Sequence, residues 1–158
     1  MGPSTFPPGL DEAAVEAAVR DAFDAWNGVD GAATVFATPT LDGELTDATT
    51  GNGTNEVVWE PLADDALARA HWQWTSGTPD LQELDVTLNP DHPWTVSPLA
   101  ESDAYDVTSV LAHELGHCAL LDVTDAPEQT MYFETAAGER KKRTPAGGDR
   151  NGWRDAYG

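Results

Sequence analysis

Two histidines and a glutamate lie close together at residues 113–117, which read HELGH. On a helix, His113 and His117 are one turn apart and project from the same face, so their imidazole nitrogens can bind one Zn²⁺ at about 2.0–2.1 Å each. Glu114 lies too far around the helix to bind the same ion easily, but it can accept a proton from a water whose pKa zinc has lowered. The spacing therefore predicts zinc-assisted hydrolysis of a peptide bond, with Glu114 as the general base that passes its proton to the leaving amine.

A five-residue pattern also recurs by chance, and the alternative is a soluble acidic domain with two surface histidines on an amphipathic helix. The surrounding segment argues against this alternative because most of it is apolar. Two histidines and a glutamate within an apolar helix would be buried polar groups that need partners, and a metal ion supplies one. The apolar residues of the segment are Val107, Val110, Leu111, Leu115, Leu120 and Leu121.

Three helices are expected around this motif. Residues 11–27 are strongly amphipathic, with acidic residues at the start of the segment. The HELGH motif belongs to a second helix, expected over residues 107–121, for which Asp106 is a natural N-cap. A short terminal helix is expected to begin at Thr144 and Pro145, because these residue types are typical of an N-cap and a first helical position.

Several short segments are expected to be strands, because they are apolar or alternate and are bounded by turn residues. We find no internal repeat and no linker that would divide the chain. The sequence therefore predicts one α+β domain over residues 1–158, in which residues 1–10 form an extended lead-in. The expected strands lie at residues 33–37, 57–59, 68–75 and 84–88.

The composition restricts the class of protein. A chain of 158 residues forms one domain and can bury a real core. It carries 28 acidic and 8 basic residues, a formal charge of -20, which disfavours nucleic acid and anionic membrane surfaces as partners. No apolar stretch approaches the roughly 18–20 residues that span a bilayer, and no N-terminal signal segment is evident. A single cysteine excludes an intrachain disulfide.

The excess of acidic residues has three interpretations. A solvated surface that keeps the protein soluble is the simplest. Adaptation to high salt would fit the small number of lysines, which are Lys141 and Lys142 only. Structural calcium is the third, because carboxylate-rich loops suit Ca²⁺. The candidate calcium ligands are Asp42, Asp47, Asp91 and Asp103.

Segments along most of the chain match the landmarks of a known family. The early helix ends in DAFDAWN, an expected strand reads NEVVWEP, and DVTLNPDHPW precedes the helix that reads DVTSVLAHELGH. TMYF follows at residues 130–133, and the tail reads GERKKRTPAGGDRNGWRDAYG. In these segments the sequence resembles the matrixin-type zinc endopeptidases of the metzincin clan, particularly the compact bacterial members.

The resemblance implies a fold, a cofactor and a substrate. The fold would be a twisted, mostly parallel five-stranded sheet with two long helices and a short C-terminal helix. The cofactors would be a catalytic zinc and often a structural calcium, and a protein or peptide substrate would lie along an edge strand. By the same resemblance Met131 is the methionine of the Met-turn and the protein is secreted. Tyr132 is expected to line the substrate pocket or to assist the oxyanion, with a packed aromatic as the alternative, and the protein is expected to be a monomer.

The sequence departs from the family at the third zinc ligand. The clan's motif is HExxHxxGxxH, and read from His113 its glycine and third histidine fall on Leu120 and Val123. Leucine favours another helical turn where glycine would let the chain leave the helix, and valine has no lone pair to bind a metal. Asp122 is the nearest carboxylate that could substitute, and Asp125 is the next.

If no third ligand substitutes, the domain is catalytically weak or inactive and acts as a binding module. Cys118 is expected to be a small buried hydrophobe rather than a ligand. His71 is expected to be structural and His92 exposed, so no second zinc is predicted. The six tryptophans are expected to pack in the core rather than form a carbohydrate-binding face.

Overall fold

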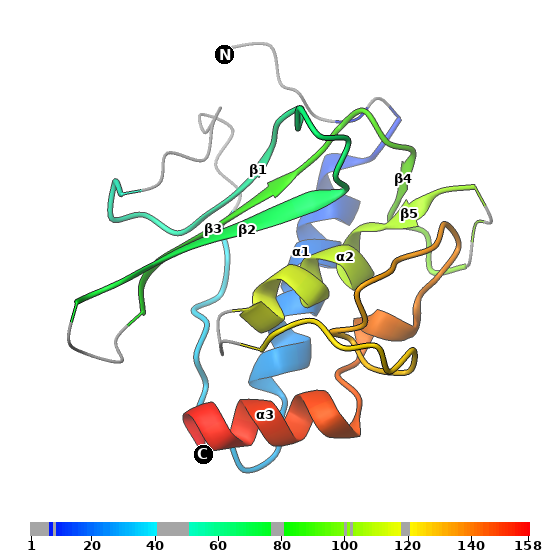
Figure 1. The fold of residues 1–158 in the computed structure, drawn as a ribbon. Helices are drawn as coiled ribbons and strands as arrows, with labels where there is room; N and C mark the ends of the chain where they lie inside the picture. Colours follow the sequence, from blue (N-terminus) through cyan, green and yellow to red (C-terminus); the bar gives the residue numbers. More distant parts are fainter. Residues whose placement is uncertain are drawn as a thin grey trace.

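The computed structural model describes residues 7, 9–40, 51–76, 81–99, 101, 103–117 and 121–158. Helices α1 and α2 pack against each other beneath a small twisted sheet, and α3 crosses below them (Figure 1). No helix in these ranges has the length and apolar composition that crossing a membrane requires. In chain order the elements are α1 (Glu12–Asn27), β1 (Glu56–Trp59), β2 (Ala68–Trp74), β3 (Leu81–Leu88), β4 (Trp94–Thr95), β5 (Tyr105–Asp106), α2 (Val107–Gly116), the 3-10 helix η2 (Lys141–Arg143) and α3 (Gly147–Tyr157).

The main sheet has three strands in the order β1-β3-β2. β1 runs parallel to β3, with Val57 opposite Val86, and β2 runs antiparallel to it, with His71 opposite Asp85. β4 and β5 form a separate parallel pair. The expected α+β class is therefore confirmed. The expected five-stranded, mostly parallel sheet is wrong for the described residues, where five strands divide between two sheets.

The strand expected at residues 33–37 is absent because a side chain takes its backbone groups. The amide oxygen of Asn27, at the end of α1, accepts the N–H groups of Val35 and Phe36 at 3.1 and 3.0 Å. The amide nitrogen of Asn27 donates to the carbonyl oxygen of Phe36 at 2.9 Å. These bonds satisfy the segment locally, so it does not pair with a neighbouring strand.

The core lies between the sheet and the helices. The amphipathic face of α1 brings Trp26 against Trp153 of α3, with ring centroids 4.6 Å apart. Both indoles are fully buried, as are apolar residues from α2 and β3. The buried cluster contains Ala18, Ala22, Trp26, Val29, Leu84, Val86, Leu88, Trp94, Val107, Val110, Leu111, Ala112, Leu115, Met131 and Trp153.

Two helices differ from their expected ends. Helix α2 ends at Gly116, with His117 as its C-cap, and Leu121 is no longer helical. Glycine has low helix propensity, which favours an end at this point. Helix α3 begins at Gly147 rather than at Thr144, because the carboxylate of Asp149 accepts the N–H of Ala146 at 2.9 Å and so caps the helix one turn back.

Candidate functional site

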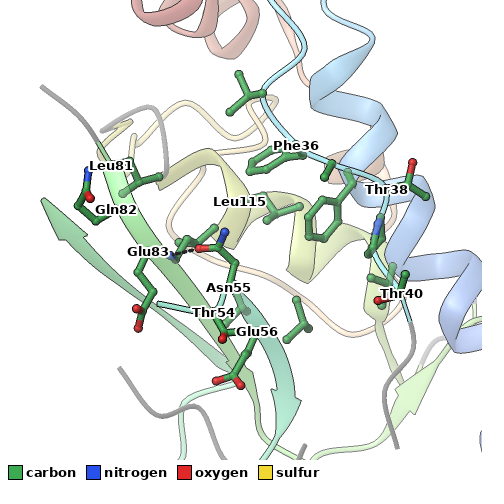
Figure 2. A pocket seen from close by; sticks show the side chains of 18 of the residues that line it. Phe36, Thr38, Thr40, Thr54, Asn55, Glu56, Leu81, Gln82, Glu83 and Leu115 are labelled. Carbon is green, nitrogen blue, oxygen red and sulfur yellow. Dashed lines mark hydrogen bonds between the residues drawn. The ribbon is translucent and has the colours of Figure 1, made fainter. Parts of the chain in front are cut away.

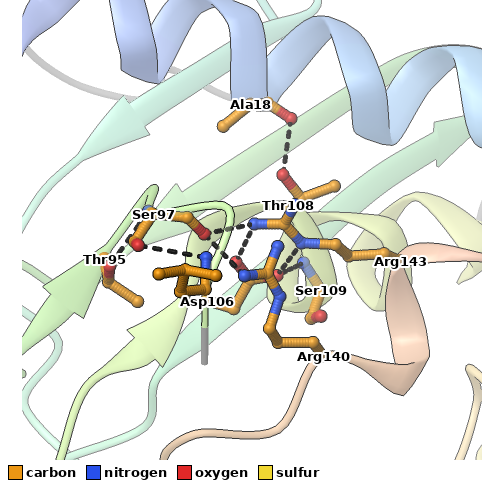
Figure 3. A network of polar contacts seen from close by, with 9 residues as sticks. Ala18, Thr95, Ser97, Asp106, Thr108, Ser109, Arg140 and Arg143 are labelled. Atoms are coloured by element: carbon orange, nitrogen blue, oxygen red, sulfur yellow. Dashed lines mark hydrogen bonds and ion pairs between the residues drawn. The ribbon is translucent and has the colours of Figure 1, made fainter. Parts of the chain in front are cut away.

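The helix that carries HELGH is anchored at its first turn by Asp106. The Asp106 carboxylate accepts the N–H of Ser109 at 2.9 Å, as predicted for an N-cap. The same carboxylate accepts from the guanidinium group of Arg143 in η2, with the Arg143 Nε 2.8 Å from the carboxylate oxygen. This hydrogen bond raises the pKa of Arg143. Figure 3 shows Arg143 and Arg140 converging on the same place, where the carbonyl oxygen of Ser97 accepts from both. The start of α2 is thereby tied to the closing segment of the chain.

The two histidines are oriented by backbone carbonyl groups. The Nδ1 of His113 donates to the carbonyl oxygen of Thr130 at 2.8 Å, and the Nδ1 of His117 donates to that of Leu121 at 2.7 Å. A carbonyl oxygen can only accept, so each Nδ1 carries a proton, and in the neutral imidazole the lone pair is on Nε2. The ring centroids are 5.2 Å apart. Metal-binding histidines are typically oriented in this way.

The carbonyl group that orients His113 is itself held by Asp149. One carboxylate oxygen of Asp149 accepts the N–H of Thr130 at 2.7 Å, and the other accepts the N–H of Met131 at 3.3 Å. Asp149 is buried in the first turn of α3. The terminal helix therefore fixes the backbone at residues 130–131, and that backbone fixes the imidazole of His113.

Met131 lies directly beneath the motif. A Cβ built at Gly116 would collide with the sulfur of Met131 and would lie 2.9 Å from the Trp26 ring. The glycine of HELGH therefore allows both side chains to approach the helix backbone. The indole N–H of Trp26 donates to the carbonyl oxygen of Ala112 at 2.7 Å, which fixes α2 to α1 at the same level. Met131 thus contacts the helix backbone at Gly116, and its role as the methionine of the Met-turn stays a prediction.

Burial changes the protonation of the motif. It lowers the pKa of His113 to about 4, so this imidazole is neutral near pH 7, the state that binds a metal. Burial raises the pKa of Glu114 to about 7, while the backbone N–H of Ala70 in β2 and the charges of Lys142 and Arg69 act in the opposite direction. A carboxylate in such surroundings exchanges protons readily near neutral pH.

A cavity of about 190 Å³ opens beside Glu114. One wall is the beginning of β2, another is α2, and the third is the loop that follows Met131. The loop contributes Phe133, whose side chain is 56% exposed, and Thr135. Sequence reasoning missed both residues, because no local pattern distinguishes them from ordinary loop residues. The lining consists of Leu67, Ala68, Val110, His113, Glu114, Phe133 and Thr135.

Tyr132 does not line this cavity. Its side chain is half-buried, and its hydroxyl donates to the Glu134 carboxylate at 3.1 Å. Burial and, next, the hydrogen bond with Glu134 raise the pKa of Tyr132. Its predicted place in the substrate pocket stays a prediction.

Trp72 departs from the expectation that the tryptophans are core residues. It lies on β2, is 41% exposed, and stacks on His117 with centroids 5.7 Å apart and planes inclined by 30°. Together with the carbonyl group of Leu121, this indole restricts the orientation of His117. The strand opposite α2 therefore contributes a second contact to the histidine pair.

The third ligand predicted from the sequence is not brought to the histidines. Asp122 is exposed, and its carboxylate accepts the N–H of Val123 at 2.8 Å. Val123, at the position of the missing third histidine, is 49% exposed. Within the described ranges no group of three or more His, Cys, Asp or Glu side chains could hold a metal ion. Leu120 and Cys118 lie outside those ranges.

The chemistry of the donors nevertheless fits zinc in part. Two imidazoles on neighbouring turns both use Nδ1 to bind a backbone carbonyl group, and His113 is neutral. Imidazole nitrogen is a preferred zinc ligand, and a catalytic site keeps one position open for water or substrate. His113 and His117 are therefore the residues that would hold the ion.

A larger cavity of about 740 Å³ lies away from the histidines, between residues 33–40, α1 and strands β1 and β3 (Figure 2). Leu115 of the motif lines this cavity, whereas neither histidine does. The two faces of α2 thus meet different cavities: His113 and Glu114 of the motif line the smaller one, whereas the carboxylates of the larger one belong to other elements.

The family model for Matrixin matches residues 4–158, and the chain belongs to this family of zinc-peptidase-type domains. No curated protein matches the chain. The family agrees with the α+β fold and with the helix that carries HELGH, and its members are hydrolases that act on proteins or peptides.

Proposed function

We propose that this protein is a zinc-dependent endopeptidase in which His113 and His117 hold the ion and Glu114 is the general base. The observation that carries the proposal is the orientation of the two histidines. Both Nδ1 atoms are occupied by backbone carbonyl groups, which leaves both Nε2 atoms for one ligand. A pair of surface histidines would have no reason to be fixed in this way from two different segments.

A zinc ion bound here would supply Lewis-acid chemistry, lowering the pKa of water and polarising a carbonyl group. Glu114 then accepts a proton from the attacking water and delivers it to the leaving amine. The N–H of Ala70 stabilises the charged form of Glu114 and keeps the carboxylate beside β2. Met131 fills the space under the motif and so limits movement of α2.

The substrate would be an extended peptide along β2. This strand ends the sheet order, and in the described part of the chain it pairs with β3 alone. A strand at the end of a sheet can pair with an added peptide through its backbone groups. The cavity beside Glu114 starts at Leu67 and Ala68, so a peptide on this strand would pass over the base.

Asp122 is proposed as the third ligand, with Asp125 as the alternative. Leu121 lies beside His117 through the hydrogen bond of its carbonyl group, so the backbone at residue 122 begins next to the site. A rotation of the Asp122 side chain away from the N–H of Val123 would be needed. Structural calcium is proposed as well. Of the candidate ligands, Asp91 and Asp103 are exposed, while Asp42 and Asp47 lie outside the described residues.

Replacement of the base tests the reaction. Glu114→Gln should lower hydrolysis of an unstructured protein by about 10²–10⁴-fold, because the amide cannot accept the proton. Zinc content should be unchanged, since Glu114 is not a ligand. The exposed Glu128 offers a control of the same type, and Glu128→Gln should leave the rate unchanged. Equal turnover by the Glu114→Gln and wild-type proteins would refute the assigned role.

A binding module without catalysis is the second candidate, and one observation favours it. No third donor joins His113 and His117 among the described residues, and two histidines alone hold zinc weakly. Elemental analysis after mild chelation separates the candidates, because tight stoichiometric zinc excludes a module without a metal site. A large rise in peptidase activity on combining Leu120→Gly with Val123→His would show that the natural site is incomplete.

The protein is also proposed to act outside the cell as a monomer. The family is typically extracellular, and a single cysteine means that the protein would have to be stable there without an intrachain disulfide. Light scattering on the purified protein measures the oligomeric state, and a dimer would contradict this part of the proposal.

A further inference from the structure

Lys142 is buried directly behind the loop that forms one wall of the cleft. Its side chain is 1% exposed, and its ammonium group donates to the carbonyl oxygen of Tyr132 at 2.6 Å and to the Thr135 hydroxyl at 2.8 Å. The second lysine of the chain, Lys141, is exposed and pairs with Glu139 at 3.7 Å. Two adjacent lysines therefore have different environments.

The buried ammonium group lacks an ion-pair partner in the part of the chain that the structure describes. The ion pairs found there involve other cations. A buried charge is normally paired, because its desolvation is costly. The ammonium group has three N–H donors, of which two are used. A positive charge is thus held behind the cleft without a carboxylate in contact with it.

Thr135 connects this charge to the cleft. It lines the cavity beside Glu114, and its hydroxyl oxygen accepts from Lys142. A hydroxyl that accepts from an ammonium group still has its own hydrogen to donate. None of the hydrogen bonds among the described residues uses the Thr135 hydroxyl as a donor. The cleft wall therefore carries an available donor that a positive charge makes stronger.

We propose that the cleft selects peptides with a carboxylate side chain, which the Thr135 hydroxyl binds while Lys142 positions this hydroxyl and balances the charge. The inference rests on the proposed peptidase function and names the substrate class of the same site. Glutamate or aspartate would be preferred over the isosteric amides, because the carboxylate gains a charge-assisted hydrogen bond.

The charge of Glu114 on the opposite wall does not prevent this selection. Lys142 and Arg69 both act on Glu114, so two of the eight basic residues of the chain are close to a single acidic group. The protein as a whole carries a charge of -20. Even so, Lys142 and Arg69 partly offset the charge of Glu114, which reduces its repulsion of an acidic side chain.

The two lysines allow a direct test by NMR. Protein labelled with ¹³C at the lysine ε-carbon gives two signals, and Lys141→Met assigns them. The probes are blocked pentapeptides of alanine with glutamate, glutamine or leucine in the middle, added to the full-length Glu114→Gln protein so that the peptides stay intact. We expect saturable shifts of the Lys142 signal and about tenfold tighter binding of the glutamate peptide than of the glutamine peptide.

Substitutions at Thr135 and at the two lysines distinguish a specific effect of Lys142 on the Thr135 hydroxyl from an effect of net charge. Thr135→Val should remove most of the preference for glutamate, because it deletes the hydroxyl but keeps the shape. Lys142→Met should do the same if the protein folds, and Lys141→Met, with the same change in net charge, should leave the preference intact. Equal binding of the two peptides, no binding of either, or a preference that survives Thr135→Val would overturn the inference.

Cleavage by the wild-type protein distinguishes this inference from the proposed function. Hydrolysis without a preference for acidic residues would overturn the inference and leave the peptidase standing. Selective binding of the glutamate peptide without hydrolysis would support the acidic subsite and count against the peptidase.

Discussion

The sulfur of Met131 occupies the space that a side chain at Gly116 would fill. The contact joins the middle of HELGH to the loop that follows it, and Trp26 closes the same space from α1. Because this part of the core is close-packed, an added methyl group must displace the sulfur, the indole or the helix.

Gly116→Ala should therefore lower the free energy of unfolding by about 1–3 kcal/mol, although alanine is the better helix former. Denaturant titration followed by tryptophan fluorescence measures the change. Gly147→Ala is the matched control, because nothing lies within 4 Å of a Cβ at that position, and it should be neutral or slightly stabilising. Equal stability of both variants would contradict the packing described here.

The two aspartate N-caps should differ in their contribution to stability. Asp11 caps α1 at the surface by accepting the N–H of Ala14 at 3.0 Å, so Asp11→Ala should cost about 1 kcal/mol. Asp106 is buried and also binds Arg143, so Asp106→Ala leaves the guanidinium group without its carboxylate partner and should cost about 3–5 kcal/mol. Urea unfolding of the two variants provides the comparison, and similar losses would show that the ion pair contributes little.

Asp85 should make the protein less stable as the pH rises. It is fully buried in β3, and burial, followed by the charge of Glu83, raises its pKa from 3.8 to about 6. The folded state then binds the proton more tightly than the unfolded state, so this contribution to stability is complete below about pH 4 and is lost as the pH rises to about 6.

Asp85→Asn should remove the loss of stability that the ionisation of Asp85 causes as the pH rises. In calcium-free buffer, the stability of the variant relative to the wild type should be higher near pH 7 than near pH 4, as measured by thermal unfolding at both values. A difference that is independent of pH would mean that Asp85 ionises normally in the folded protein.

Zinc content should identify the third ligand. Asp122→Asn should lower zinc occupancy, because an amide oxygen is a weaker ligand than a carboxylate. Asp125→Asn removes the same charge three residues further along an exposed loop and should not change occupancy. Atomic absorption after dialysis provides the measurement. Equal zinc occupancy in both variants would exclude Asp122 as a ligand. A loss of zinc from the Asp125→Asn variant alone would identify Asp125 as the third ligand.

Local patterns in the sequence were sufficient for the helix that carries the motif and for its N-cap. The period of apolar residues predicted α1 and α2, and Asp106 caps α2 because the first turn of a helix offers free N–H groups. A short apolar run predicted strand β1, and alternating apolar residues predicted β2 and β3, to within a few residues. These features depend on interactions between residues close together in the chain, which a single sequence records.

The tertiary structure decided the surroundings of the motif. The carbonyl group that orients His113 comes from residue 130, the indole over His117 from residue 72, and the ammonium group behind the cleft from residue 142. It also decided that Asn27 would bind residues 35 and 36 in place of a strand. Such contacts join segments through packing, and packing depends on the shape of the whole core, which no short pattern in the sequence encodes.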